Sequence, residues 1–265
     1  FHLPGMLHGK VLRSPHAHAR IKSIDTSHAE AFPGVHAVVT AADFPKITSN
    51  VIDAGEAGQI DMQDVADNCI AREKVFYDGH AVAAVAADNA HIAEEAANLI
   101  QVDYELLDPV MDVRSAMADN APVLHDDFLP GAFLAPTEKA LPNASKLELA
   151  MGDISNGFDE ADIVIEREFT TETVHQGYIE PHAATARWER DGRITIWDSS
   201  QGHFSMRDLT ALVLDVPISQ IKVIPMEVGG GFGGKLHIFI EPVAALLSKK
   251  AGRPVKITLT RAEEF

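Results

Sequence analysis

The sequence predicts an α+β fold made of two parts that are joined by an irregular connection. Up to about residue 110, short apolar runs alternate with turn residues, a pattern typical of strands. Regular patterning stops over 111–160, which contains several prolines, and it returns over 161–265. These changes predict a first domain over 1–110, an interdomain connection over 111–160 and the beginning of a second domain over 161–265.

In the first part, strands outnumber helices. One helix is predicted over 89–100, because Asp88 can cap it and its apolar stripe includes Ile92 and Ala96. The acidic stretch over 46–73, which includes Glu56, has little periodicity, so we expect a surface excursion there. The predicted strands of this part are 7–13, 19–25, 35–40, 81–87 and 101–104.

In the second part, the turn Arg190-Asp191-Gly192 separates two alternating runs and predicts a β-hairpin. The helix predicted over 205–214 is amphipathic. The helix over 242–250 is expected to start at Pro242 and to end at Gly252. The predicted strands of this part are 162–170, 183–189, 193–198 and 221–228.

Composition and charge exclude several classes of protein. The 39 acidic and 22 basic residues give a net charge of −17, and basic residues cluster only over 249–256, so we expect no nucleic-acid partner. A single cysteine, Cys69, can neither form an internal disulfide nor ligate an iron–sulfur cluster, which takes four thiolates. No apolar run reaches the length of a membrane span, and we expect a cytoplasmic protein. Phe1 already lies in a turn, which predicts that the chain is a fragment.

The most informative segment is a glycine-rich loop. It reads Gly229-Gly230-Gly231-Phe232-Gly233-Gly234-Lys235 and follows a predicted strand. Five glycines in six positions carry a large cost in backbone entropy. We therefore expect another group to approach this backbone closely. Uncovered amide N–H groups can cradle a phosphate or another group rich in acceptors.

Three interpretations of the loop compete before any resemblance is considered. The loop fits the phosphate-loop pattern up to Lys235, but Leu236 stands where that loop needs Ser or Thr for magnesium. It also fits a dinucleotide-binding pattern through Gly229, Gly231 and Gly234, yet the next predicted helix starts too late. The third alternative is a non-catalytic scaffold in which the loop is only a turn between packed elements.

Further motifs occur in a fixed order around this loop. Tyr178-Ile179-Glu180-Pro181-His182 and the run 196–203, Ile-Trp-Asp-Ser-Ser-Gln-Gly-His, precede it, and the runs 252–256 and 261–265 follow it. Together with the loop, they resemble the molybdopterin-binding large subunit of the xanthine dehydrogenase/aldehyde oxidase family. The segments 3–17 and 77–85 are similar to the α/β hammerhead domain of that family. The resemblance implies a hammerhead-type domain followed by the first part of a molybdopterin-binding domain.

The resemblance also implies a cofactor and its contacts. In the family, molybdenum is held by a pyranopterin dithiolene, as molybdopterin or as its cytosine dinucleotide, and no side chain ligates the metal. Gln201 matches a glutamine that hydrogen-bonds an oxo ligand of molybdenum, and a neutral amide can do this without competing for the metal. Arg207 either orients the cofactor or anchors its helix. The loop residues expected at the cofactor are Gly230, Gly231, Phe232, Gly233 and Gly234, with Phe232 over the metal site.

The resemblance further implies a reaction and its partners. Family members insert oxygen derived from water at an electron-poor carbon and pass electrons to [2Fe-2S] clusters and FAD on partner subunits or domains, so we expect a hetero-oligomer. The general base is a glutamate near the family's C-terminus, and no carboxylate of this chain matches its motif. We therefore expect no catalytic residue in this chain, with the base lying beyond Phe265, and we expect the chain to be inactive alone.

One departure from the family pattern concerns the substrate. Members that oxidise purines carry a glutamate after the loop lysine, whereas Leu236 occupies that position here. Leu236 and Phe232 are the expected lining of the substrate pocket. An apolar side chain cannot replace the hydrogen bonds of a carboxylate. The resemblance thus predicts oxidation of an aldehyde or an aromatic heterocycle other than xanthine.

Overall fold

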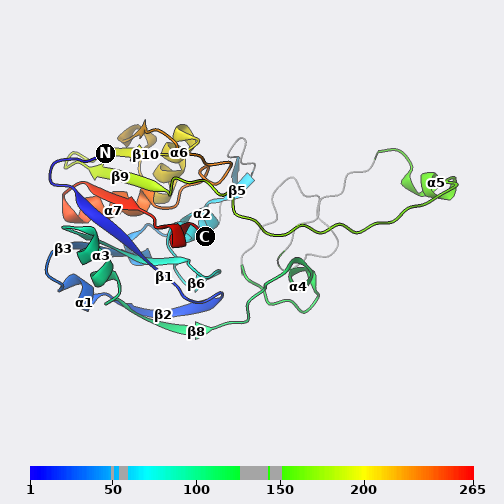
Figure 1. Cartoon of the computed structure of the whole chain (residues 1–265), viewed down its shortest axis with the longest axis horizontal. Coiled ribbons are helices and arrows are strands. Elements are labelled where there is room, and N and C mark those ends of the chain that lie inside the picture. Colours follow the sequence, from blue (N-terminus) through cyan, green and yellow to red (C-terminus); the bar gives the residue numbers. More distant parts are fainter. Residues whose placement is uncertain (49–50, 54–58, 126–142, 144–150) are drawn as a thin grey trace. The chain divides into compact units, whose positions relative to one another are not determined.

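The computed structural model describes residues 1–48, 51–53, 59–125, 143 and 151–265 (Figure 1). These residues form two units. The first comprises Phe1–Pro109 and Gln176–Phe265, and the second comprises Val110–His175. Glu56 and most of the predicted connection, over 126–142 and 144–150, lie outside the described residues.

A seven-stranded mixed sheet organises the first unit, and it takes strands from both ends of the chain. Strand β1 (Leu7–Arg13) pairs in parallel with β12 (Val255–Thr258), with Leu7 opposite Val255. The predicted domains 1–110 and 161–265 thus contribute to one sheet, whose order is β11-β10-β9-β12-β1-β7-β3. The domain boundaries themselves stay a prediction. The other strands of the sheet are β3 (Val35–Thr40), β7 (Ala81–Ala87), β9 (Ala183–Trp188), β10 (Ile194–Asp198) and β11 (Ile221–Pro225).

Helices cover both faces of the sheet at strand β7. Every residue of β7 is buried. Its alternate side chains face two different clusters: Ala83 and Val85 pack in the cluster that contains α3 (Ala90–Ala97), whereas Ala84 and Ala86 pack in the one that contains α7 (Glu241–Ala251). This two-residue alternation is the expected pattern of a strand buried on both faces.

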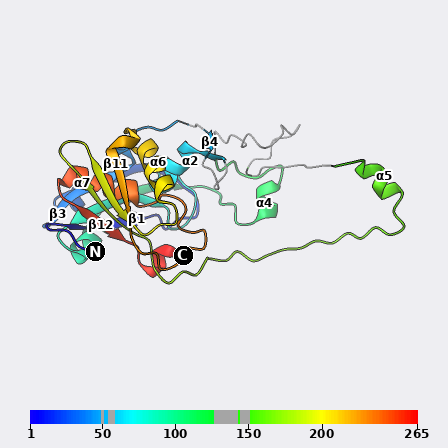
Figure 2. The same ribbon diagram turned by 90° about the horizontal axis from the view of Figure 1, so that it is seen from above.

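Helices α2 (Met62–Cys69) and α6 (His203–Leu214) contact each other and lie side by side in both views (Figures 1 and 2). The prediction of a surface excursion over 46–73 is wrong for α2, because Met62 and Cys69 are each only 2% exposed. Val65 and Ala66 pack against the same core. These four positions follow helical spacing, a signal that the acidic residues between them obscured.

Smaller elements complete the first unit. A three-stranded sheet has the order β6-β2-β8, and β4 pairs with β5. Within the described residues, no helix has the length and apolarity that would be needed to cross a membrane. The bounds of these elements are β2 (Ala19–Asp25), β4 (Val51–Asp53), β5 (Gln59–Asp61), β6 (Lys74–Val75), β8 (Gln101–Leu106), α1 (Ser27–Glu30), η1 (Ala41–Asp43), η3 (Ile218–Gln220) and α8 (Arg261–Glu264).

The start of α3 differs from the prediction. Asn89, and not Asp88, is the N-cap, and its side chain accepts a hydrogen bond from the backbone N–H of Ile92 at 3.0 Å. Asp88 instead lies 2.8 Å from Nε2 of His36. Both residue types are good caps, so the local sequence alone could not decide between neighbours.

The second unit contains two short helices, α4 (Val113–Met117) and α5 (Ile154–Asp159), capped by Asp112 and Asp153. The predicted strand over 162–170 is wrong: no described strand lies there, and Ile163 and Ile165 are 79% and 72% exposed. A strand exists only where its backbone pairs with a neighbour, and alternating apolar residues cannot supply that neighbour.

Candidate functional site

The glycine-rich loop (229–235, hereafter the glycine loop) follows the end of β11 in the first unit. The strand predicted over 221–228 ends at Pro225, and the backbone N–H of Met226 donates to the carbonyl of Asp198 at 2.9 Å. Within the loop, Gly230 and Gly233 have φ values of +98° and +95°, which favour glycine. Phe232 also has a positive φ, +52°, and its side chain is 73% exposed. A non-glycine residue in this conformation costs about 1–2 kcal/mol.

The side chain of Gln201 binds the backbone of the glycine loop. Its side-chain Oε1 accepts hydrogen bonds from the backbone N–H groups of Gly233, at 3.0 Å, and Lys235, at 3.2 Å. Its own backbone N–H donates to the carbonyl of Lys235 at 2.9 Å. A Cβ on Gly231 would lie 2.3 Å from Oε1 of Gln201, so a larger residue there would force the Gln201 side chain out of this position. The two N–H donors of the amide group are not used by the described residues, and they remain for a ligand.

An ion pair between fully buried Lys235 and partly exposed Glu180 joins the two ends of the loop. Lys235 is fully buried, and its Nζ donates to Oε2 of Glu180 at 2.8 Å. The same carboxylate oxygen accepts from the backbone N–H of Gly229 at 2.6 Å. The ammonium also lies 5.2 Å from the centre of the Tyr178 ring. The sequence did not predict this role of Glu180; the only local signal was Lys235, a charged residue directly after the glycine run.

The segment 178–182 is in turn held by α8. Oε2 of Glu264 accepts a hydrogen bond from the Tyr178 hydroxyl at 2.7 Å and lies 3.0 Å from Nδ1 of His182. Burial raises the pKa of Glu264, but the hydrogen bonds from His182 and Tyr178 outweigh it and lower the pKa to about 2. Arg261 donates to the carbonyl of Tyr178 at 2.9 Å. The runs 178–182 and 261–265, which the sequence singled out separately, thus form one structure.

Two further acids near the glycine loop, Asp198 and Glu241, are buried. Asp198 ends β10, three residues before Gln201, and Glu241 is the first residue of α7. Each is 2% exposed. Burial raises the pKa of both carboxyls, and the charge of Asp198 raises that of Glu241 further, to about 8. At neutral pH, the pair therefore keeps a proton on Glu241.

This pair predicts a pH dependence of stability. Between about pH 4.5 and 8, folded Glu241 stays protonated while it ionises in the unfolded chain, so the free energy of unfolding should fall as pH rises through this window. Glu241→Gln should flatten this slope in urea unfolding measured from pH 5 to pH 9. An unchanged slope in Glu241→Gln would contradict the assignment of the proton.

Two other residues predicted for the site are Arg207 and Leu236. Arg207, on α6, pairs with Asp208 at 2.7 Å and lies 5.3 Å from the centre of the Phe204 ring. These contacts are within its own helix, and both roles considered for Arg207 stay predictions. Leu236 is half-buried and directly follows the ion-paired lysine.

The structure does not support either nucleotide-binding interpretation of the glycine loop. Both need a helix whose N-terminus starts at the glycine loop. The first helix after the loop is α7, which begins only at Glu241. The residues between contain turns and bends and no helix.

The donor set of the loop fits a cofactor rich in acceptor oxygens. Nothing lies within 4 Å of the position that a Cβ on Gly233 would take, so this backbone is open to a ligand. The side-chain amide of Gln201, which is hydrogen-bonded to the backbone of Gly233, adds uncharged N–H donors at the same place. Among the described residues, no group of three or more His, Cys, Asp and Glu side chains could hold a metal ion.

Comparison with known proteins assigns the two parts of the chain. Residues 1–108 match the model of the aldehyde oxidase and xanthine dehydrogenase a/b hammerhead domain, and residues 137–265 match the model of the molybdopterin cofactor-binding domain. The chain is therefore a hammerhead domain with part of a molybdopterin-binding domain, as the sequence predicted.

Individual relatives agree with this class. The chain is 38% identical over 262 residues to a probable xanthine dehydrogenase subunit of Bacillus subtilis (strain 168), covering 98% of this chain and 32% of the relative. It is 36% identical over 284 residues to a probable hypoxanthine oxidase of Escherichia coli O157:H7, covering 97% and 29%. The crystal structure of quinoline 2-oxidoreductase from Pseudomonas putida 86 superposes with a TM-score of 0.79 at 31% identity, covering 100% and 32%.

The chain belongs to the xanthine dehydrogenase/aldehyde oxidase family of molybdenum-dependent oxidoreductases, and it matches part of the molybdopterin-binding large subunit of that family. It spans about a third of the length of the two relatives named above.

Proposed function

We propose that this chain supplies part of the cofactor site of a molybdenum hydroxylase, and that Gln201 and the glycine loop bind the molybdenum–pyranopterin. The observation that carries the proposal is the double use of the Gln201 amide. Its oxygen fixes the loop backbone at Gly233 and Lys235, and its N–H donors stay available on the same side chain. Site geometry and ligand contact are thus coupled through one residue.

When bound, the cofactor supplies a two-electron redox centre that transfers oxygen. The chain's own residues bind and orient it. The amide of Gln201 donates to an acceptor oxygen of the cofactor, while the open backbone at Gly233 lets the ligand approach closely. With the cofactor bound, the ring of Phe232, which is 73% exposed in this chain, would lie over it and help to exclude water. Glu180 and Lys235 act indirectly, because they close the loop on itself.

The wider reaction follows from membership of the family. We infer that electrons leave through [2Fe-2S] clusters and FAD on partner subunits or domains, and that the intact enzyme is a hetero-oligomer. None of the carboxylates described above is assigned as the general base. Glu180 is occupied by Lys235, and Glu264 by Tyr178 and His182.

Two substitutions of Gln201 separate positioning from ligand contact. Gln201→Glu keeps an acceptor oxygen for the N–H groups of Gly233 and Lys235 but removes the amide donors. In the intact protein, it should keep its melting temperature and either fail to load molybdenum or lose turnover roughly 10²–10³-fold, the loss in kcat that removal of one preorganised donor causes. Gln201→Ala should also destabilise the loop, because both loop contacts go. Gln220→Ala on η3 is the matched control. Full loading and turnover of Gln201→Glu would refute the donor role.

For the substrate, we propose an aldehyde or an aromatic heterocycle other than xanthine. Support comes from Leu236, which gives the pocket an apolar side chain directly after Lys235. A purine placed against it would leave polar ring atoms unpaired, at a cost of about 1–3 kcal/mol. The named relatives include a probable xanthine dehydrogenase subunit and a quinoline oxidoreductase, so the choice lies within the range of the family.

Steady-state kinetics on the cofactor-loaded protein test this choice. We expect the kcat/KM for xanthine to be lower than that for quinoline or benzaldehyde. Leu236→Glu should raise the value for xanthine relative to the others, because it restores a carboxylate. A wild-type preference for xanthine over every aldehyde and heterocycle tested would overturn the proposal.

A further inference from the structure

A basic pocket lies in the first unit, at the end of the sheet opposite the glycine loop. Strand β9 begins at Ala183, beside the 178–182 motif, and ends at Trp188, which lines the pocket. Six residues of strand separate the two regions by about 20 Å. The pocket has a volume of about 920 Å³ and falls in the range of small-molecule sites. Its lining includes Leu3, Pro4, Gly5, the run 187–193, Lys249, Gly252, Arg253 and Pro254.

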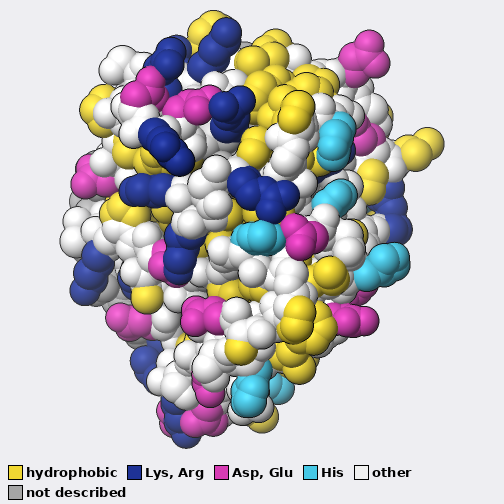
Figure 3. Space-filling view, turned by 90° about the vertical axis from the view of Figure 1, so that its left-hand side faces the viewer, with side chains coloured by type: hydrophobic (Ala, Val, Ile, Leu, Met, Phe, Trp, Pro, Cys, Tyr) yellow, Lys and Arg dark blue, Asp and Glu magenta, His cyan; other side chains and the backbone are white. Residues whose placement is uncertain are grey.

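The charge of this pocket is opposite to that of the chain. Five cationic side chains line it, against two acidic ones, although acidic residues outnumber basic ones by 39 to 22 overall. Lysine and arginine side chains gather on this face of the molecule (Figure 3). The cations are Arg187, Arg190, Arg193, Lys249 and Arg253, and the acids are Glu189 and Asp191.

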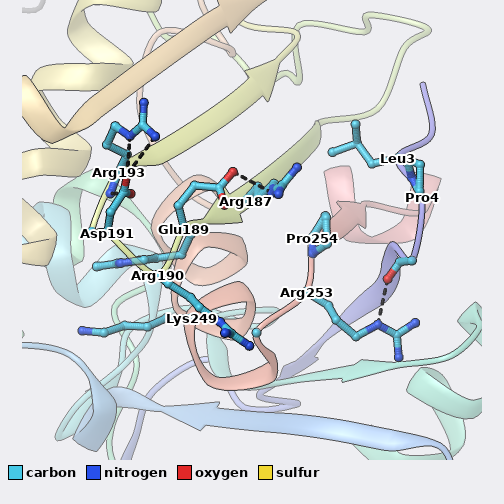
Figure 4. Close-up of a pocket in the computed structure, with 14 residues that line it drawn as sticks. Leu3, Pro4, Arg187, Glu189, Arg190, Asp191, Arg193, Lys249, Arg253 and Pro254 are labelled. Carbon is cyan, nitrogen blue, oxygen red and sulfur yellow. Dashed lines mark hydrogen bonds and ion pairs between the residues drawn. The ribbon is translucent and has the colours of Figure 1, made fainter.

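Only part of this positive charge is neutralised locally. Arg187 pairs with Glu189, and Arg193 pairs with Asp191, each at 2.7 Å (Figure 4). Arg190 has no hydrogen bond or ion pair to any residue that the structure describes. A concave, positively charged surface concentrates the field and attracts multivalent anions.

The remaining two cations are held in place by the fold. Arg253 donates through Nε to the carbonyl of Gly5 at 2.8 Å, and its guanidinium lies 3.4 Å from Asp88 at one edge. The ammonium of Lys249 lies 4.4 Å from the centre of the Trp188 ring. Lys249 also complements the negative end of the α7 dipole, which is a reason for a positive charge at this position even without a ligand. That explanation does not extend to Arg187, Arg190 and Arg193, which lie on β9 and the turn after it.

We propose that this pocket binds a small multivalent oxyanion, a molecule with two or more phosphate or carboxylate groups. Arginine matches this chemistry, because a guanidinium donates two parallel hydrogen bonds to a phosphate or carboxylate. The cations come from two separate elements, the β9–β10 turn and the end of α7, so they can hold two anionic groups at once. The concave shape favours a small molecule over the flat surface of a protein.

Isothermal titration of the intact protein at low ionic strength tests the proposal, with pyrophosphate and citrate as probes and acetate as the monovalent reference. We expect at least one of the two multivalent anions to bind with a Kd at least roughly tenfold below that of acetate. The tighter of the two identifies the headgroup as phosphate or carboxylate. Heats no larger than those of sodium chloride at equal ionic strength would overturn the proposal.

A matched pair of charge reversals localises the binding. Arg190→Glu should weaken the tighter probe at least roughly tenfold, since it removes a pocket cation and adds an anion. Lys22→Glu, on β2 in the separate three-stranded sheet, changes the net charge equally and should leave the Kd within about twofold. Equal weakening by both variants would reduce the effect to net charge and refute a site. Tighter binding of an acidic peptide than of either probe would assign the pocket to a protein partner and also refute it.

Discussion

Gly231→Ala should strongly reduce cofactor loading while the sheet stays folded. The new Cβ would lie 2.3 Å from Oε1 and 2.6 Å from Cδ of Gln201, well inside contact distance. Gln201 would have to move away and lose its hydrogen bonds to Gly233 and Lys235, at a net cost of about 1–3 kcal/mol. Its amide would then no longer reach the ligand. We expect molybdenum content to fall roughly tenfold, since every 1.4 kcal/mol corresponds to about a factor of ten in binding.

The control is another glycine-to-alanine change in open space. Gly157, on α5, has nothing within 4 Å of an added Cβ. Gly157→Ala should load normally, and both variants should keep the far-ultraviolet circular dichroism of the wild type. Gly233→Val tests the same loop through its backbone. Nothing lies within 4 Å of an added Cβ, but the φ of +95° is a conformation that a β-branched residue resists. Normal molybdenum content in Gly231→Ala would show that Gln201 does not need its position.

Glu180→Ala should be the most destabilising single change at the site. It leaves the ammonium of Lys235 without its anion; for a fully buried pair such a change costs about 3–5 kcal/mol, which is an upper limit here because the Glu180 side chain is 34% exposed. It also removes the acceptor for the N–H of Gly229. Urea unfolding should show a lower midpoint at an unchanged slope.

The double variant Glu180→Ala/Lys235→Met separates a charge effect from general damage. It removes the buried cation together with its partner and keeps the unbranched apolar stem. We expect it to recover at least half of the lost stability, because no unpaired charge remains. A double variant as unstable as Glu180→Ala alone would refute the ion pair as the cause.

Most of the regular elements could be predicted because their signals are local. The strands 7–13, 19–25, 35–40 and 81–87 have the predicted bounds. The helix predicted over 242–250 is α7, which starts one residue earlier and ends as expected before Gly252 in the left-handed conformation. Pairing partners could not be predicted. The parallel contact of β1 with β12 joins residues about 250 positions apart, and no local pattern encodes that register.

The candidate site shows the same division. The glycine run and the glutamine at position 201 were visible in the sequence. Their coupling was not, because it depends on Oε1 of Gln201 lying inside the loop. Glu180 and Lys235 are 55 positions apart, and only the fold brings their charges together. Likewise, α8 holds the 178–182 motif through Glu264 across 86 positions, which no spacing rule could predict.

The most direct measurement is the molybdenum and pterin content of the intact protein, produced in a host that makes the cofactor. If the glycine loop and Gln201 form the cofactor site, the purified protein should contain about one molybdenum and one pterin per chain. The Gly231→Ala variant, prepared in parallel, should contain about a tenth of each or less. Wild-type protein free of both molybdenum and pterin under several maturation conditions would contradict the central claim.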